Sequence, residues 1–138
     1  MGTRRKGREL ALQALYQLEI TGDPSAAAVD LFLGHFEGGL EAKQFARRLV
    51  SGVVSQRATI DRLIQQCAEN WRLVRMSKVD LLILRMAAYE LVFCPDIPLH
   101  VTLDEAIEIA KRFGTGDSPS FINGVLHQLA HSDAAKSE

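Results

Sequence analysis

The sequence predicts an all-α protein, and three observations support that fold class. Apolar residues recur at helical spacing along most of the chain, capping residues and Gly or Pro stops separate the periodic segments, and no stretch shows the alternation of a strand. The length of 138 residues suits one domain, 1–138, whose core needs neither metal nor disulfide. We expect about seven helices around one central apolar helix, in two nearly equal subdomains of about 1–70 and 71–132, followed by a polar tail at 132–138.

Four helices are expected in the first subdomain. A first apolar stripe ends at a turn that contains Gly22, and Ser25 caps the segment that follows. Thr59 is a candidate cap for the fourth helix, but the sequence leaves open whether that helix is separate from the third. The expected segments are Thr3–Ile20, residues from about 25 to 37, residues from about 40 to 56, and residues from about 59 to 67.

The central helix is predicted at Val79–Phe93, where apolar residues occupy every side of a helical wheel. Ser77 and Asp80 form an S-x-x-D capping box at its start, and a proline shortly after its end prevents continuation. The three charges of this helix, Asp80, Arg85 and Glu90, are spaced by five and fall on different sides. Each must therefore reach the surface or find a partner.

Two further helices complete the second subdomain. Thr102 and Glu105 form another capping box, which predicts a helix that ends at Gly114 in a left-handed cap. After the loop GTGDS, Pro119 suits the first position of the last helix. The inward-facing residues of this helix are expected to be Ile122, Val125, Leu126 and Leu129.

Composition restricts the class of function. Net charge is −1 and the pI is near 6.4, so any affinity for nucleic acid must come from a local cluster of charges. Cys67 and Cys94 are too few for a zinc site or a disulfide framework, which suits a reducing cytoplasm. The N-terminus lacks the apolar run of a signal peptide, and no segment is apolar enough to span a membrane. We expect a cytoplasmic protein.

The sequence predicts neither a catalytic site nor a metal site. Asp104, Glu105 and Glu108 form the densest acidic cluster, but the first turn of a helix favours acids for electrostatic reasons. His127 and His131 lack the intervening glutamate of a zinc-binding helix. Because no nucleophile has a partnered base either, we expect no enzyme activity and no cofactor.

The basic N-terminal segment is more informative. Arg4, Arg5, Lys6 and Arg8 place four positive charges in five positions at the start of the first helix. Cations oppose the helix dipole there, which favours a functional reason, and guanidinium groups bind phosphate bidentately. A solvated, disordered arm is the alternative. Gly7 weakens the helix locally, as expected of an arm that becomes ordered on binding.

A second candidate site lies at residues 114–124, GTGDSPSFING. Free N–H groups at a helix start, beside glycines that allow close approach, predict an anion site. Phe121 lies on the flank of the apolar face, where it could stack on an unpaired base, although a core position is the alternative. Asn123 offers a donor and an acceptor either for a base edge or for a local backbone bond.

Four motifs, in order along the chain, carry a family resemblance. They are RRKGRELALQALYQ at 4–17, VDLLILRMAAYEL at 79–91, DEAIEIAKRFG at 104–114 and DSPSFINGVL at 117–126. Together they resemble the NusB family of bacterial transcription antitermination factors. The resemblance implies two three-helix subdomains plus a short extra helix, no catalysis, and a heterodimer with NusE, a small-subunit ribosomal protein. It also implies binding to the single-stranded boxA element of leader RNA and read-through of terminators by RNA polymerase, chiefly in ribosomal RNA operons.

The resemblance also implies roles for individual residues. The RNA-binding residues would be Arg4, Arg5, Lys6, Arg8, Arg85, Phe113, Asp117, Ser118 and Phe121, to which the base-edge argument adds Asn123. The NusE-binding residues would be Tyr16, Asp80 and Arg85. The sequence departs from the family pattern at Gly7, Leu81, Asp104 and His127. The extra acid at 104 could weaken RNA affinity, and Leu81 could indicate a more apolar partner surface or self-association.

Two alternative functions stay open. One is the NusB-like leading domain of a ribosomal RNA cytosine methyltransferase, although 138 residues leave no room for its cofactor-binding sheet. The other is a helical interaction module, or a homodimer, that binds no RNA.

Overall fold

The computed structural model describes residues 2–23 and 25–136, and every regular element in these ranges is helical. The predicted all-α class is therefore confirmed. Its elements are α1 (Thr3–Thr21), α2 (Ala26–Gly34), α3 (Leu40–Ser55), α4 (Arg57–Cys67), the 3-10 turn η1 (Leu73–Arg75), α5 (Lys78–Phe93), α6 (Leu99–Phe113) and α7 (Ser118–Ala130). Residues 137 and 138 of the predicted polar tail lie outside the described ranges.

The chain forms two compact units, Met1–Ser55 and Gln56–Glu138, and their division falls earlier than the sequence suggests. The backbone leaves helical geometry at Gln56, where φ is −109° and ψ is 16°, so α4 is a separate helix from α3. Thr59 lies inside α4 and does not cap it. Because α4 packs against α5 and α7, it belongs to the second unit, which has four α-helices to the first unit's three.

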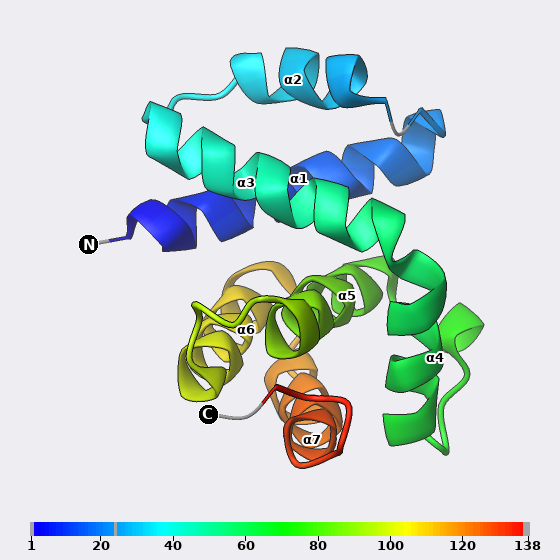
Figure 1. Cartoon of the computed structure of the whole chain (residues 1–138). Helices are drawn as coiled ribbons and strands as arrows, with labels where there is room; N and C mark the ends of the chain where they lie inside the picture. The colour runs from blue at the N-terminus through cyan, green and yellow to red at the C-terminus, as the bar shows by residue number, and fades with distance from the viewer. Residues whose placement is uncertain (1, 24, 137–138) are drawn as a thin grey trace. The chain divides into compact units, whose positions relative to one another are not determined.

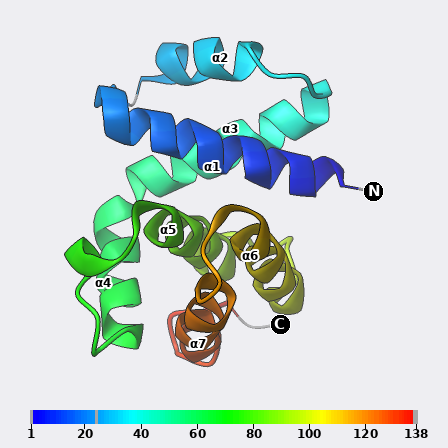
Figure 2. The same ribbon diagram turned by 180° about the vertical axis from the view of Figure 1, so that it is seen from behind.

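In the first unit, α1 and α3 cross as a packed pair, and α2 lies along one side of them (Figures 1 and 2). Gly22 ends α1 in the left-handed region with φ at 75°, and its N–H donates to the Leu18 carbonyl at 2.7 Å. Ser25 caps α2 as predicted, since its hydroxyl accepts a hydrogen bond from the Ala28 N–H at 3.1 Å. The core of this unit includes Leu10, Ala11, Ala14, Leu15, Val29, Leu33, Ala46, Leu49 and Val53.

In the second unit, α5 is the buried helix, as the apolar sequence at Val79–Phe93 predicts. It packs against α4, α6 and α7 (Figure 1). All eight residues from Leu81 to Ala88 are buried, so every side of the helix faces other helices. Ser77 caps α5 by accepting a hydrogen bond from the Asp80 N–H at 3.1 Å. The predicted inward residues of α7 are also confirmed: Ile122, Val125, Leu126 and Leu129 are buried.

The two buried charges of α5 have partners within this unit. Arg85 donates from Nε to Asp61 Oδ1 at 2.8 Å and from Nη2 to Asp61 Oδ2 at 3.1 Å, a bidentate pair that ties α5 to α4. Glu90 is 1% exposed, and its Oε1 accepts a hydrogen bond from the Thr102 hydroxyl at 2.8 Å. Both interactions satisfy polar groups that would be costly to bury alone.

The bond to Glu90 explains why the predicted capping box at Thr102 is wrong. The α6 helix begins three residues earlier, at Leu99, and Pro98 occupies the N-cap position with extended backbone geometry. The Pro98 carbonyl accepts the first hydrogen bonds of the helix from Val101 and Thr102. Thr102 is therefore helical, and its hydroxyl satisfies a buried carboxylate in place of the helix end.

The polar tail folds back onto the second unit as far as Lys136. The Lys136 N–H donates to the Leu91 carbonyl at 3.1 Å, and its ammonium group donates to the Glu90 carbonyl. Both carbonyls lie near the carboxyl end of α5, where the helix dipole favours a cation. The Glu90 carbonyl also accepts a hydrogen bond from the Cys94 N–H at 3.2 Å.

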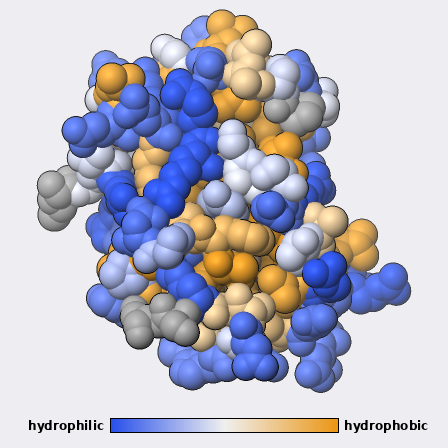
Figure 3. All heavy atoms as spheres, in the orientation of Figure 1, coloured by the Kyte–Doolittle hydropathy of each residue, from blue (hydrophilic) through white to orange (hydrophobic). Residues whose placement is uncertain are grey.

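The surface of the molecule is predominantly hydrophilic on the face shown in Figure 3, with hydrophobic residues visible between the polar ones. Seven large apolar or aromatic side chains among the described residues are exposed: Tyr16, Ile20, Leu31, Leu40, Val54, Trp71 and Val74. Among the helices of residues 2–23 and 25–136, none has the length and hydropathy to cross a membrane.

Candidate nucleic-acid interface

The basic segment forms the first two turns of α1 in the first unit. Gly2 occupies the N-cap position with φ at 88°, no side chain caps the helix, and the first turn contains no acid. Arg4, Arg5 and Lys6 are exposed, whereas Arg8 is buried. Three cations thus lie on the surface at the positive end of a helix dipole, an arrangement that favours a bound anion.

Three guanidinium groups gather around one aromatic ring at this end of the unit. The guanidinium carbons of Arg4, Arg8 and Arg48 lie 4.9, 5.2 and 6.0 Å from the centroid of the Phe45 ring. Arg48 belongs to α3, and the sequence pattern does not predict it as a site residue. The signal available for it is its spacing three residues after Phe45, on the same helix face.

Gly7 packs closely against α3, and this corrects the interpretation of the segment as an arm that orders on binding. A Cβ atom at position 7 would lie 2.9 Å from both the Ala42 carbonyl oxygen and Phe45 Cδ2. Such contacts are shorter than real Cβ atoms tolerate, so a glycine is needed for α1 and α3 to approach this closely. The basic segment is therefore part of a regular helix that packs against α3 at Gly7, with Arg4, Arg5 and Lys6 exposed.

The second candidate site, at the loop between α6 and α7, differs from the sequence prediction in two respects. Gly114 has extended backbone geometry, with φ at −94° and ψ at −164°, so the predicted left-handed cap is wrong. A Cβ there would lie 2.4 Å from Ser118 Oγ, which shows that the loop needs glycine for close approach. Ser118 is buried, and its hydroxyl accepts a hydrogen bond from the Thr115 N–H at 2.9 Å.

The start of α7 therefore has fewer free donors than the anion-site prediction assumes. The Ser118 N–H donates to the Thr115 carbonyl at 3.1 Å, and Pro119 has no N–H. Ser118 closes the loop and thereby positions its neighbour Asp117, which is exposed at the N-cap position without a side-chain capping bond.

A pocket of about 210 Å³ lies beside this loop, and we call it the Trp71 pocket. The rings of Trp71 and Phe121 meet edge to face, with centroids 5.8 Å apart and planes at 71°. Trp71 is 53% exposed and Phe121 is half-buried. Phe121 therefore belongs neither to the core nor to the open surface. The pocket is lined by Trp71, Arg75, Met76, Ser77, Asp80, Asp117 and Phe121.

Trp71 is a site residue that the sequence motifs do not predict. Its position in the sequence could have indicated a role at the surface, because the only tryptophan of the chain lies in the connector before η1, outside any apolar stripe. Gln65 holds this connector, since its side-chain amide donates to the Trp71 carbonyl at 2.8 Å and its amide oxygen accepts from the Leu73 N–H at 3.2 Å.

The remaining predicted residues occupy different environments. Arg85 has a side chain only 6% exposed in its pair with Asp61, so it is held inside the second unit. Tyr16 is 45% exposed on α1, and Asn123 is half-buried on α7. Phe113 is half-buried at the end of α6, where the guanidinium carbon of Arg112 lies 5.3 Å from its ring centroid.

Asp80 combines a half-buried side chain with an unsatisfied acceptor. Its Oδ1 atom is buried and has no hydrogen-bond partner among the described residues. In a complete capping box the Asp80 carboxylate would accept a hydrogen bond from the Ser77 N–H, but Oδ1 accepts none. The other bond of the box is present, since the Asp80 N–H donates to the Ser77 hydroxyl.

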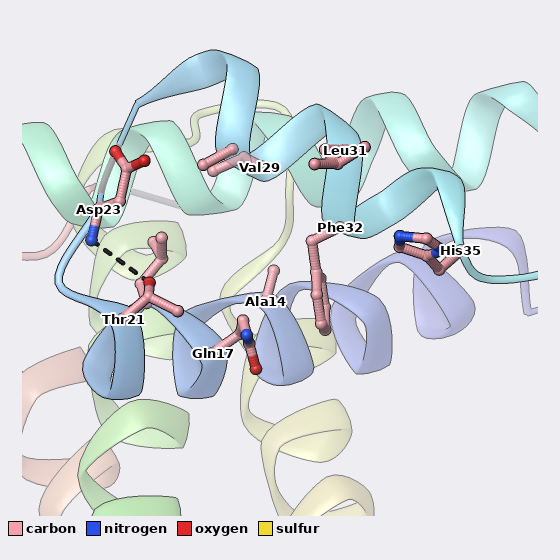
Figure 4. Close-up of a pocket in the computed structure, with 10 residues that line it drawn as sticks. Ala14, Gln17, Thr21, Asp23, Val29, Leu31, Phe32 and His35 are labelled. Atoms are coloured by element: carbon pink, nitrogen blue, oxygen red, sulfur yellow. Dashed lines mark hydrogen bonds between the residues drawn. The ribbon is translucent and has the colours of Figure 1, made fainter.

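A second pocket, of about 270 Å³, lies between α1 and α2 in the first unit (Figure 4). Phe32 points from α2 toward α1, Ala14 and Val29 contribute apolar surface, and Asp23 and His35 are at opposite ends in this view. The Asp23 N–H donates to Thr21 Oγ1 at 3.3 Å. This pocket shows that α2 covers α1 only partly.

Burial raises the pKa of the Cys67 thiol, so this group stays protonated at neutral pH and is a poor nucleophile. Within residues 2–23 and 25–136, His, Cys, Asp and Glu form no group of three that could hold a metal ion. The first unit carries exposed cations at the start of α1. The second unit carries the Trp71 pocket, which contains aromatic rings and carboxylates.

These features define a class: small all-helical proteins built from two helical units, with surfaces that suit an anion and a planar ring. The NusB family model matches residues 5–131. The transcription antitermination protein NusB of Desulfatibacillum aliphaticivorans is 49% identical over all of this chain and 96% of its own length, and that of Geobacter sulfurreducens is 52% identical over 94% and 95%. The chain belongs to the NusB family.

Solved structures agree with the fold. NusB from T. maritima superimposes with a TM-score of 0.83 at 42% identity, covering 95% of this chain and 92% of that one. A chain in the crystal structure of antitermination factors NusB and NusE in complex with dsRNA has a TM-score of 0.82 over 94% of this chain and 97% of that one. At 21% identity, this second likeness establishes the fold alone.

Proposed function

We propose that this protein is a non-enzymatic transcription antitermination factor of the bacterial cytoplasm. It binds boxA-type, single-stranded leader RNA together with NusE and promotes read-through by RNA polymerase, chiefly in ribosomal RNA operons. Support comes from full-length relatives that carry the name of transcription antitermination protein and from the solved complex of a same-fold NusB with NusE and RNA.

The observation that carries the RNA part of the proposal is the exposed cationic helix start. Arg4, Arg5 and Lys6 lie on the surface where the helix dipole adds to their charge, and no acid of the first turn offsets them. A protein with a net charge of −1 gains nothing for RNA binding from its overall field, so this local cluster supplies the attraction. Arg8 is buried, with its guanidinium carbon 5.2 Å from the centroid of the Phe45 ring.

The second unit supplies base contacts in this proposal. Phe121 and Asp117 lie at the Trp71 pocket, and Phe113 and Asn123 are half-buried residues of α6 and α7. Ser118 acts by closing the loop, and Arg85 acts by holding α5 to α4 through Asp61, so both position the RNA contacts without touching RNA. For NusE we propose contacts at Tyr16 and Asp80.

The test is titration of a fluorescently labelled boxA-type RNA by anisotropy, with and without NusE, at several salt concentrations. Removing two phosphate contacts with Arg4→Ala and Arg5→Ala should flatten the slope of log K against log salt by about 1.4, because each contact to single-stranded nucleic acid contributes about 0.7. Helix content and thermal stability should change little, since both side chains are exposed.

The matched control removes two exposed cations elsewhere, Arg62→Ala and Lys111→Ala, with the same change in net charge. It should leave the salt slope unchanged. Equal slopes for both double variants would exclude the α1 segment from the RNA site. If the unmodified protein does not bind the RNA with or without NusE, the proposal of an RNA-binding factor is wrong.

A further inference from the structure

Two histidines lie side by side at the carboxyl end of α7. The ring centroids of His127 and His131 are 5.8 Å apart, and their planes differ by 14°. A spacing of four residues places both side chains on one face of the helix, and both residues are exposed. Two imidazole rings in this arrangement can approach one common ion in the solvent beside the helix.

A hydrogen bond fixes the orientation and the tautomer of the His131 ring. Its Nδ1 atom lies 2.7 Å from the His127 carbonyl oxygen. Because a carbonyl only accepts hydrogen bonds, Nδ1 carries the hydrogen, and the neutral ring has its free lone pair on Nε2. Metal-bound histidines commonly have this arrangement, in which one ring nitrogen donates to a backbone carbonyl and the other binds the metal. The His131 ring therefore has both the supporting hydrogen bond and the free nitrogen of a metal ligand.

The His127 ring is free to supply a second ligand. It is exposed, and its ring nitrogens form no hydrogen bond or ion pair within the described part of the chain. Zinc binds histidine nitrogens at about 2.0–2.1 Å, so the two nitrogens must lie closer together than the ring centroids do here. Rotation of the exposed His127 side chain can bring its nitrogen towards Nε2 of His131.

We propose that His127 and His131 form a two-histidine site for a divalent transition metal such as zinc, separate from the proposed RNA-binding function. Imidazole nitrogens suit zinc, copper and nickel, whereas magnesium and calcium take oxygen ligands. The ion lies at the carboxyl end of α7, where the helix dipole favours positive charge. No third His, Cys, Asp or Glu of the described residues joins the pair, so water completes the coordination. The bound ion links two side chains across the last turn and stabilises that end of the helix.

The lack of a glutamate between the histidines restricts the chemistry of this site but not its binding of metal. In the H-E-x-x-H motif the two histidines bind zinc, and the glutamate acts as a general base. This chain reads HQLAH at 127–131, with Gln128 at the position of the glutamate. It therefore keeps the pair of ligands and lacks the base, which fits a site that binds an ion without hydrolysing a substrate.

Isothermal titration calorimetry of the full chain with zinc chloride, in a reducing buffer that does not bind metals, tests the site. We expect one zinc ion per chain. His127→Ala and His131→Ala should each weaken zinc binding about 100-fold or more, because two linked contacts exceed the affinity of one by about 10²–10⁴. Magnesium chloride should give no binding at this site, since it requires oxygen ligands.

Two controls separate this pair from the number of histidines. His35→Ala with His100→Ala removes the other two histidines of the chain and should leave zinc affinity unchanged. Gln128→His with His131→Ala keeps four histidines but places two at adjacent positions, about 100° apart around the helix, and should bind zinc as weakly as His131→Ala. Circular dichroism checks that each variant is folded.

NMR of the histidine ring nitrogens identifies the ligand atoms. Zinc should shift the Nε2 resonance of His131 most strongly and leave its Nδ1 protonated. Coordination through Nδ1 of His131, or no zinc binding by the unmodified chain, would overturn the proposal. It would also be wrong if either single histidine variant kept full affinity, or if Gln128→His with His131→Ala bound zinc as tightly as the unmodified chain. None of these results would alter the proposed RNA binding, which is measured separately.

Discussion

Gly7 shows how a single residue can have opposite local and tertiary effects. Helix propensity alone favours alanine over glycine by about 1 kcal/mol in a helix interior. The packing of α1 on α3 reverses this preference, because the Ala42 carbonyl and the Phe45 ring leave no space for a Cβ atom. The same contact places Phe45 under the guanidinium groups of Arg4, Arg8 and Arg48.

Gly7→Ala should therefore destabilise the protein despite the gain in helix propensity. Overpacking of this kind costs about 1–3 kcal/mol, which exceeds the gain of about 1 kcal/mol. Gly124→Ala is the matched control: Gly124 lies inside α7, and a Cβ atom added there would meet no other helix or side chain within 4 Å, so this change should stabilise by about 0.5–1 kcal/mol. Urea unfolding measures both. Stabilisation by both changes would show that α1 and α3 do not approach closely at Gly7.

Thr102 offers a second test at the scale of one residue. Thr102→Val keeps the shape of the side chain but removes the hydroxyl that donates to the buried Glu90. Loss of one hydrogen bond to a buried carboxyl group costs about 1–3 kcal/mol, so the free energy of unfolding should fall by about that amount. Thr102→Ser keeps the donor and should cost less. A result in which Val is tolerated better than Ser would indicate that Thr102 acts only by packing.

Residue roles that depend on distant partners could not be predicted from the sequence. The charge of Arg85 was visible in the helix pattern, but its partner Asp61 lies 24 residues away on another helix, and no local signal connects them. Ser118 was predicted from the family resemblance as an RNA contact, whereas its burial against Gly114 depends on the path of the loop. By contrast, the exposed charges at Arg4, Arg5 and Lys6 follow directly from local sequence.

At the scale of elements, helix positions were predictable because periodicity and capping act locally. The central helix was predicted at Val79–Phe93 and is found at Lys78–Phe93, and Ser25 and Ser77 cap their helices as expected. The start of α6 was not predictable from Thr102, because a capping hydroxyl and a core hydroxyl look the same in sequence. The choice between them depends on the buried carboxylate of Glu90.

The α2 helix is the least secured of these elements. It buries only Val29 and Leu33, a pocket separates part of it from α1, and its ion pair to α3, between Asp30 and Arg47, is exposed and contributes little. Elements with few buried apolar contacts open locally at low free energy. We therefore expect amide hydrogens of α2 to exchange faster than those of α1 and α3.

Loss of the α2 cap should increase that difference. Ser25→Ala removes the hydroxyl that accepts from the Ala28 N–H, at a typical cost of about 1 kcal/mol to the helix. Hydrogen exchange followed by mass spectrometry should show faster exchange in Ala26–Gly34 with little change in α7. Ser51→Ala, at an exposed position inside α3, is the control and should leave exchange in α2 unaltered. Uniform acceleration throughout the first unit would mean that α2 unfolds only together with α1 and α3.

At the scale of the whole molecule, 16 basic and 17 acidic residues nearly cancel, so affinity for RNA depends on where charges lie. The first unit concentrates exposed cations at the start of α1, and the second unit carries the aromatic pocket at Phe121 and Trp71. Phosphate contacts supply affinity that depends on salt, while base contacts depend on sequence. A single RNA that uses both surfaces would therefore show both dependences.

If the first unit binds phosphates and the second unit binds bases, variants of the two units should have different effects on RNA binding. Phe121→Leu keeps much of the apolar volume at a half-buried position but removes the aromatic face, so it should weaken RNA binding by about 1–3 kcal/mol without altering the salt slope. The Arg4→Ala and Arg5→Ala double variant should lower the slope without altering the preference between bases. If one RNA contacts both units, the two losses should add in the combined variant, since contacts that share no partner contribute independently. Phe36→Leu, at a half-buried aromatic of the first unit, controls for general loss of an aromatic ring.

Shortening the RNA provides a second test. When the RNA is short enough that Phe121→Leu no longer changes its affinity, the arginine double variant should still weaken its binding. Loss of both effects at the same RNA length would mean that the two surfaces do not act as separate contacts.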